Sequence, residues 1–250
     1  MTPKYAKDFL QDVLIRGDFA SPVEGFSKSP PKGFLEAAKS AGFARLEPRE
    51  VVGQTLMLGK DSLKHERVTG QEWIVHESEG KGHVNLGTGA MYISRQKHKG
   101  YESQRDAFLS LLDSLYAVQP ELALKRLGLR YIDVIRLDGS TALDWREYIH
   151  DDLICSLGFS KKAPLVRAFN VLEYDYGDFR LKFQYGMPNP DYPARIVQRQ
   201  FVLDMDAYVD ALLEPNDVPS VLDGAHSAVS ELYEDCILDR LRDVMGVVES

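Results

Sequence analysis

The sequence predicts an α+β fold in which antiparallel sheet is backed by helices. Short runs rich in β-branched and aromatic residues are joined by turn residues, which is typical of hairpins. Helical spacing of apolar residues is confined to a few well-separated segments. The 250 residues, 44% of them hydrophobic, can bury a sizeable core. We therefore expect a single domain over residues 1–250, with two distantly similar halves, 1–138 and 139–250, as the alternative.

The first half of the chain combines hairpins with two helices. Gly42 closes the first expected helix and Pro120 ends the second, where Phe108, Leu111 and Leu115 recur at helical spacing. Residues 78–82 have the composition of a turn between strands. The expected strands are 9–19, 51–58 and 71–77, with residues 83–94 completing a hairpin, and the expected helices are 33–41 and one that opens at Tyr101.

The rest of the chain repeats this pattern. Residues 126–137 predict a strand with apolar side chains on both faces, which is typical of a strand inside a sheet. Residues 218–245 predict one long helix, because their apolar stripe follows a period of about 3.6 residues for about seven turns. The remaining expected elements are an amphipathic helix over 141–157, a hairpin of 165–173 with 179–185, and a strand over 195–206.

Composition restricts the cellular compartment and the kinds of partner that we expect for this protein. No apolar run approaches the roughly 20 residues that span a bilayer, and residues 1–19 are too charged for a secretory signal. Cys155 and Cys236 lie in apolar helical patterns and fit a reducing compartment as small hydrophobes. We expect a cytoplasmic protein. Residues 1–125 carry a net charge of +1 and residues 126–250 carry −9, which disfavours broad binding to nucleic acid.

Opposite charges stand on two of the expected strands. Arg126 and Arg130 share one face of their strand, and guanidinium groups pair with carboxylates or phosphates. Asp204 and Asp206 also share a face and could hold Mg²⁺ or Mn²⁺, but a metal cage needs a third oxygen ligand that the sequence does not supply. We therefore expect the four side chains to approach one another as a structural row of ion pairs, without metal or cofactor.

His226 stands one turn into the last expected helix, near Asp223. A histidine there could act as a general base or as a proton-linked switch. No nucleophile accompanies it at a recognisable spacing, so a hydrogen-bonded histidine at the edge of the core is the favoured interpretation and no catalytic residue is assigned. The glycines around Lys81 and Thr88 do not match a phosphate-binding loop.

Several of these segments resemble a sporadically distributed, uncharacterised bacterial family of about this length. Arg126-Leu127-Gly128-Leu129-Arg130-Tyr131-Ile132-Asp133 is similar to its R-(I/L)-G-L-R-Y-(I/V)-N core, with Asp133 where asparagine is usual. Leu203-Asp204-Met205-Asp206 and Leu222-Asp223-Gly224-Ala225-His226 are similar to its L-D-(I/M)-D and L-D-x-x-H segments. The resemblance implies that Arg126, Arg130, Asp204, Asp206, Asp223 and His226 contribute to a shared site. The patchy distribution is similar to that of genes in mobile elements, anti-phage defence islands and toxin–antitoxin loci.

These observations favour an interaction protein, an accessory, sensor or neutralising subunit that binds a macromolecular partner. We expect that partner to be a protein, encoded nearby, and a homo-oligomer stays open. One alternative is a metal-dependent enzyme on nucleotide or nucleic acid that uses Asp204, Asp206 and His226. A second alternative is an RNA-binding module that uses Arg126 and Arg130 on a sheet face.

Overall fold

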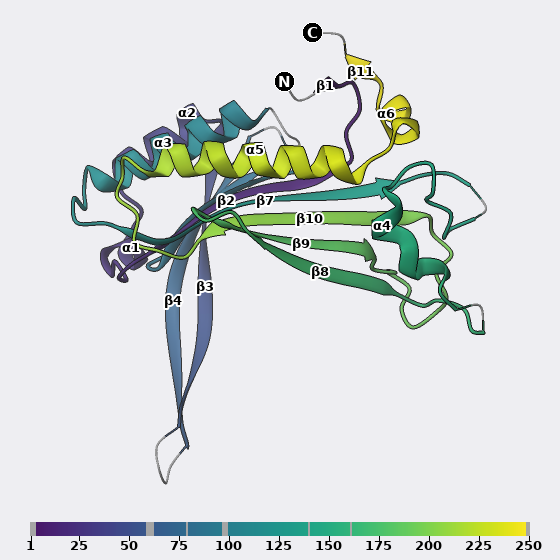
Figure 1. Cartoon of the computed structure of the whole chain (residues 1–250). Coiled ribbons are helices and arrows are strands. Elements are labelled where there is room, and N and C mark those ends of the chain that lie inside the picture. The colour runs from purple at the N-terminus through teal and green to yellow at the C-terminus, as the bar shows by residue number, and fades with distance from the viewer. Residues whose placement is uncertain are drawn as a thin grey trace. The chain divides into compact units, whose positions relative to one another are not determined.

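The computed structural model describes residues 4–58, 63–78, 80–96, 100–139, 141–160 and 162–248, and the side chains of residues 53–69 lie outside the description. The predicted α+β class is confirmed: these residues form six α-helices and a nine-stranded antiparallel sheet (Figure 1). The strand order in the sheet is β3-β4-β5-β6-β2-β7-β10-β9-β8.

The chain divides into two compact units whose segments interleave along the sequence. The α3 unit comprises residues 14–128 and 210–219, and the α5 unit comprises residues 1–13, 129–209 and 220–250. Strands β2 (Leu10–Phe19) and β7 (Leu124–Arg136) contribute residues to both units. The alternative of two distantly similar halves, 1–138 and 139–250, stays a prediction.

In the α3 unit, helices pack on the strands through the apolar face that the sequence predicts. Phe108, Leu111 and Leu115 of helix α3 (Tyr101–Tyr116) are fully buried. Gly17 of β2 faces this helix, where an added Cβ would lie 3.1 Å from the Leu124 side chain and 3.5 Å from that of Phe108. The elements are α1 (Gly25–Lys28), α2 (Lys32–Ser40), β3 (Phe43–Leu58), β4 (Leu63–Glu77), β5 (His83–Leu86), β6 (Ala90–Arg95) and α3 (Tyr101–Tyr116).

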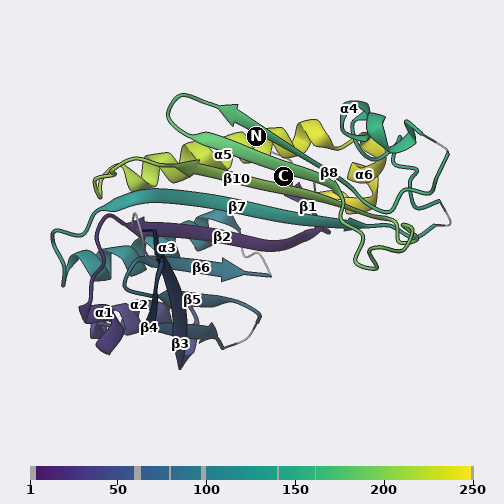
Figure 2. The same ribbon diagram turned by 90° about the horizontal axis from the view of Figure 1, so that it is seen from below.

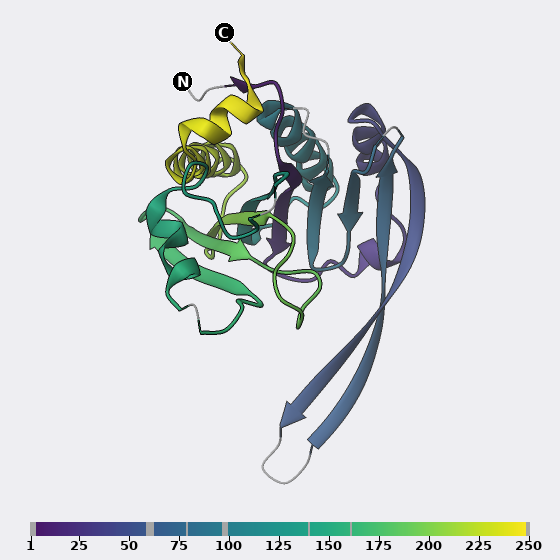
Figure 3. The same ribbon diagram turned by 90° about the vertical axis from the view of Figure 1, so that its right-hand side faces the viewer.

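The strands expected at 51–58 and 71–77 belong to a longer hairpin. Strands β3 and β4 pair continuously from Phe43 opposite Glu77 to Leu58 opposite Leu63, with one irregularity between Phe43 and Arg45. Figures 1 and 3 show this two-stranded ribbon running out beyond the short strands β5 and β6. Residues 59–62, between the two strands, lie outside the description.

In the α5 unit, one long helix lies along one face of the strands. Leu222, Ala225 and Val229 of this helix are buried. Figure 2 views the opposite face, where β10, β9 and β8 lie in front of the helix. The elements are β1 (Lys4–Tyr5), α4 (Asp151–Ile154), a 3₁₀ turn (Cys155–Gly158), β8 (Ala168–Asp175), β9 (Arg180–Met187), β10 (Gln200–Val209), α5 (Val218–Cys236), α6 (Asp239–Met245) and β11 (Val247–Val248).

Strand β7 is internal to the sheet, as its two-sided apolar pattern predicts. It lies between β2 and β10. Leu127, Leu129 and Ile135 are buried on the face that also carries Tyr131. The side chains of the other face are half-buried.

The prediction of one helix over 218–245 is wrong, because the helix ends at Cys236. Ile237 instead forms a β-bridge with Ile149. The His150 N–H donates to the Cys236 carbonyl over 2.9 Å, and the Leu238 N–H donates to the Tyr148 carbonyl over 3.0 Å. Backbone groups that a continuous helix would use internally are thus bonded to another segment, and α6 starts afresh at Asp239.

The prediction of a helix over 141–157 is also wrong, since residues 141–150 form turns and irregular backbone. Its one α-helical stretch is α4, followed by the 3₁₀ turn. Trp145 is fully buried with its ring centroid 5.4 Å from that of Phe201, and Arg199 stacks over the rings of Trp145 and Tyr148. Burial of this indole overrides the helical pattern of the segment.

Cys155 and Cys236 are both free thiols. Cys236 is buried, as predicted, and burial raises the pKa of its thiol. Cys155 is exposed, so the expectation that it acts as a small hydrophobe is wrong. Among the described residues, no helix combines the length and the apolar character needed to cross a membrane.

We expect Ile237→Ala to lower the free energy of unfolding by about 2–5 kcal/mol, because Ile237 is fully buried at the bridge that ends α5. Chemical denaturation measures the change. Val244→Ala, on the half-exposed side of α6, is the control and should cost well under half as much. Equal losses of unfolding free energy in the two variants would show that the bridge does not contribute more to stability than an exposed position.

Candidate functional site

Arg130 and Asp204 form a bidentate ion pair in the α5 unit. Arg130 Nε donates to Asp204 Oδ1 over 2.7 Å, and Nη2 donates to Oδ2 over 2.6 Å. Gln184 Nε2 adds a longer bond of 3.3 Å to Oδ2. The hydrogen bond from Asp204 raises the pKa of Arg130 against the opposing effect of burial, and the charges of Asp204, Asp206 and Asp12 raise it further. The predicted approach of Arg130 to Asp204 is confirmed.

The ion pair stands on the face of the sheet that lies opposite α5, which we call the open face. Strand pairing places Asp204 opposite Gln184 and Asp206 opposite Lys182. The next strand continues both rows, with Val171 opposite Gln184 and Glu173 opposite Lys182. Glu173 also accepts a hydrogen bond from the Tyr208 hydroxyl. The row of Asp206, Lys182 and Glu173 thus alternates acidic and basic groups across the open face.

Arg126 belongs to the α3 unit, where its Nε lies 3.3 Å from Asp210 Oδ1. Both side chains are substantially exposed, so the pair contributes little to stability. The predicted approach of Arg126 to Asp204 and Asp206, which lie in the other unit, stays a prediction.

His226 stands on the opposite face of the sheet from the ion pair. The Tyr131 hydroxyl lies 3.1 Å from His226 Nδ1, and the two ring centroids are 5.9 Å apart. Because Arg130 and Tyr131 are consecutive in a strand, their side chains point to opposite faces. The structure therefore does not bring His226 together with Asp204, as an enzyme using both would need. It favours a hydrogen-bonded histidine at the edge of the core.

Asp223 is exposed on α5, one turn before His226. The Ser227 hydroxyl donates to its backbone carbonyl over 3.1 Å. In the described ranges, no group of three or more His, Cys, Asp or Glu residues is arranged to hold a metal ion. The motif residues of the α5 unit thus divide between the open face and α5.

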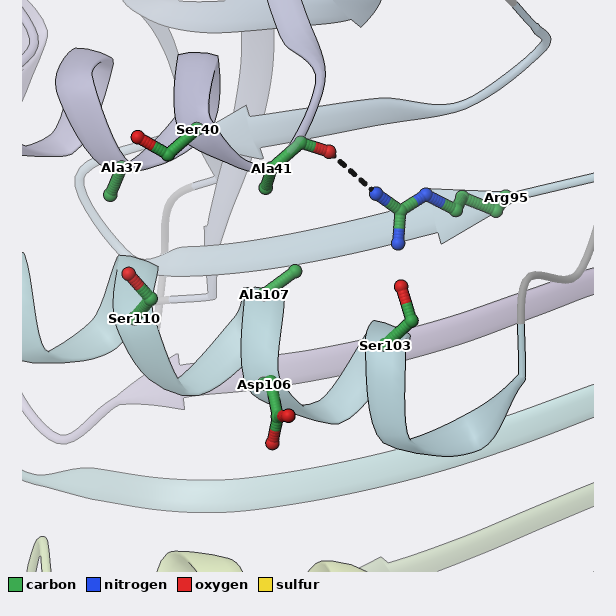
Figure 4. Close-up of a pocket in the computed structure, with 8 residues that line it drawn as sticks. All are labelled: Ala37, Ser40, Ala41, Arg95, Ser103, Asp106, Ala107 and Ser110. Carbon is green, nitrogen blue, oxygen red and sulfur yellow. Dashed lines mark hydrogen bonds between the residues drawn. The ribbon is translucent and has the colours of Figure 1, made fainter.

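A groove between α2 and α3 contains a buried arginine that sequence reasoning missed (Figure 4). Its cavity of about 440 Å³ is lined by small and polar side chains from both helices. Arg95, at the end of β6, is only 2% exposed. It donates to Glu77 Oε1 over 3.2 Å, to Gln104 Oε1 over 3.1 Å and to the Ala41 carbonyl over 2.9 Å.

Arg95 acts as a structural clamp in this groove. Its guanidinium also lies 4.7 Å from the centroid of the Phe43 ring. Glu77 is 9% exposed and neutralises the buried charge, while Gln104 and Ala41 tie it to α3 and to the end of α2. A guanidinium satisfied this fully by its own chain holds elements together rather than awaiting a ligand.

Asp133 is a second buried ionisable group. In the sequence it stands out only because the similar family usually has asparagine at this position. It is 7% exposed, on the same face of β7 as Tyr131. Burial raises the pKa of its carboxyl to about 7, with a further contribution from Asp8. Asp133 in turn helps raise the pKa of Tyr233 on α5, which burial raises most. Ionising Asp133 in this place is costly.

The outermost strand of the α5 unit, β8, exposes a run of large apolar side chains. The exposed fractions are 49% for Phe169, 51% for Val171, and 39% for both Leu172 and Tyr174. These residues come from both faces of the strand, so turning the strand over would not bury them all. Sequence reasoning expected this hairpin but not its position at the edge, because strand order is not encoded in local pattern.

The pairing with β9 shows which backbone groups of β8 point away from the sheet. The Tyr176 N–H donates to the Phe179 carbonyl, which extends the register that pairs Tyr174 with Leu181 and Leu172 with Phe183. In an antiparallel ladder, hydrogen-bonded pairs alternate with non-hydrogen-bonded ones. The N–H and C=O groups of residues 169, 171, 173 and 175 therefore point outward, along a side where the described part of the chain adds no further strand.

The other edge strand, β3 in the α3 unit, is protected over its first part, residues 43–49. Pro48 offers no N–H, and Arg45, Glu47 and Arg49 place charges along the strand. The register irregularity between Phe43 and Arg45 disturbs its start. Proline, charge and bulges are the usual means by which proteins prevent pairing at a sheet edge. The middle of β8 has none of these over residues 169–172.

No protein-family profile matches this chain, and no curated protein matches it either. The resemblance to the sporadically distributed bacterial family therefore stays a prediction.

We expect the stability of the protein to fall as pH rises from about 4 to about 7. The pKa of Asp133 near 7 in the folded chain exceeds the usual carboxyl value, so the folded state holds this proton to higher pH than the unfolded state. Asp133→Asn removes the effect and should raise the free energy of unfolding at pH 8 by up to about 4 kcal/mol. Denaturation at pH 5 and pH 8 measures this. Asp223→Asn, at an exposed position, is the control; a wild-type difference between the two pH values that survives in Asp133→Asn would contradict the prediction.

We also expect calorimetric titration with Mg²⁺ or Mn²⁺ to show no stoichiometric binding at Asp204. Both carboxylate oxygens of Asp204 already accept hydrogen bonds from Arg130. A cation would have to displace a guanidinium held by charge-assisted bonds. Stoichiometric binding in the wild type that Asp204→Asn abolishes would refute this and support the metal-dependent enzyme.

Proposed function

We propose that this protein is an interaction protein that binds an extended segment of a polypeptide chain by adding it as a further strand beside β8. The observation that carries the proposal is the outward row of N–H and C=O groups on β8, flanked by exposed Phe169, Val171, Leu172 and Tyr174. In strand addition, main-chain hydrogen bonds supply affinity and alternate side chains supply specificity.

The composition of β8 supports a partner rather than a strand that faces water. Water solvates outward backbone groups well enough, but it does not compensate for a contiguous run of exposed apolar side chains. Residues 43–49 of the edge strand β3 carry the usual means of closing an edge. Their absence from the middle of β8 fits an edge that is covered in the assembled state.

The two alternative functions receive less support from the geometry. For an enzyme, Asp204 is held by Arg130, and His226 stands on the other face of the sheet. For an RNA-binding module, the open face of the α5 unit surrounds Arg130 with Asp12, Asp204 and Asp206, whose charges repel phosphate. A role as accessory or neutralising subunit in a defence or toxin–antitoxin locus rests on the resemblance alone.

Site-specific photocrosslinking in cells tests the proposal. We expect a photoreactive amino acid at Val171 to crosslink to a polypeptide segment that mass spectrometry can identify, because this side chain stands at the open edge. The matched control is the same amino acid at Leu46, which is 41% exposed on the protected edge strand β3. Absence of a crosslink at position 171, or equal yields at the two positions, would overturn strand addition at β8.

A further inference from the structure

We infer that the strand added beside β8 is β8 of a second copy of this chain, paired antiparallel about a two-fold axis that passes through Asn170. The inference rests on the proposed function, since it names the occupant of the same edge. The observation that leads to it is the order of charged and apolar side chains over residues 167–173, which matches its own reverse.

Backbone geometry limits the possible registers to a few. Residues with outward N–H and C=O groups must lie opposite residues of the same kind, and on β8 these are the odd-numbered positions. A two-fold axis that falls between two residues would place odd positions opposite even ones and lose the ladder. The axis must therefore pass through a residue, and the candidates near the middle of the exposed apolar run are Phe169, Asn170, Val171 and Leu172.

An axis through Asn170 matches the side chains in kind at every pair from Arg167 to Glu173. Phe169 of each copy lies opposite Val171 of the other, so the two most exposed apolar residues of β8 cover each other. On the same face Arg167 lies opposite Glu173, an opposite-charge pair that occurs twice because of the symmetry. On the other face Ala168 lies opposite Leu172. Apolar and opposite-charge pairs of this kind are the stabilising unit of a sheet.

In the neighbouring registers, the same apolar side chains lie opposite charged ones. An axis through Val171 places Phe169 opposite Glu173. An axis through Leu172 places Val171 opposite Glu173 and Phe169 opposite Asp175, and an axis through Phe169 places Val171 opposite Arg167. Within residues 167–173, each of these registers leaves an apolar side chain beside a charge in both copies, and the Asn170 register does not.

Two contacts within each copy restrain the side chains of Arg167 and Glu173 before the two copies meet. The Arg167 guanidinium lies over the Tyr192 ring, 4.5 Å from its centroid, which holds it beside the start of β8. The Glu173 carboxylate accepts a hydrogen bond from the Tyr208 hydroxyl, and this bond fixes the carboxylate on the open face. Side chains that are already restrained lose less conformational entropy when the second copy arrives.

Cysteine crosslinking tests both the occupant and the register. Asn170 lies opposite its own copy at a non-hydrogen-bonded position, where Cβ atoms are about 4.5–5.5 Å apart. In a Cys155→Ser background that removes the exposed native thiol, Asn170→Cys should give a disulfide-linked dimer on mild oxidation. Val171→Cys is the matched control, and it should give little dimer because its thiol faces Phe169 of the other copy. Dimer from Val171→Cys but not from Asn170→Cys would overturn the register.

Sedimentation of the uncrosslinked protein completes the test. The wild type should approach twice the mass of one chain as concentration rises, and Val171→Pro should stay at the mass of one chain with an unchanged circular dichroism spectrum. Proline at this position removes an outward N–H and no bond to β9. A wild type that stays monomeric at every concentration would overturn the second copy as occupant. The proposed function would then stand if position 171 crosslinks to a different protein, and fall if it crosslinks to none.

Discussion

The α5 unit depends on the two-residue alternation of strand β7. Each step along β7 turns a side chain to the opposite face of the sheet, so Tyr131 and Asp133 face the side of α5 while Arg130 faces the open side. This alternation separates two environments that need different chemistry. The α5 side tolerates a hydrogen-bonded tyrosine and histidine, whereas the open side requires each charge to stand beside an opposite one.

Two ionisable groups of β7 illustrate that difference. The Arg130 guanidinium is still about one third exposed, and a carboxylate meets it in bidentate geometry. The Asp133 carboxyl is buried, and Asp8, whose charge also raises its pKa, has the same sign. The same strand therefore carries one charge that its surroundings stabilise and one that they oppose, three residues apart.

The sequence predicted the parts of the fold that depend on local pattern. Strands β2 and β7, the β8–β9 hairpin and helices α2 and α3 all have a clear period bounded by turn residues. The helices expected at 141–157 and 218–245 failed because long-range contacts, the burial of Trp145 and the bridge at Ile237, prevailed over helical periodicity. In the candidate site, the partnership of Arg130 with Asp204 followed from matched charges on half-buried strands. The Arg95–Glu77 pair did not, because strand pairing and not sequence spacing brings those residues together.

The bridge between Ile149 and Ile237 also bears on how the chain folds. It joins segments 88 residues apart, and strands β8, β9 and β10 and helix α5 all lie within the loop that it closes. Closing a long loop costs entropy before its contacts repay that cost, whereas the β8–β9 hairpin closes over a few residues. Folding of this region should therefore begin locally, with the hairpin, and end with the bridge. The β8 edge would then be formed and accessible while the chain is still completing its core, a period in which a newly made copy could meet its partner or aggregate with the wrong one.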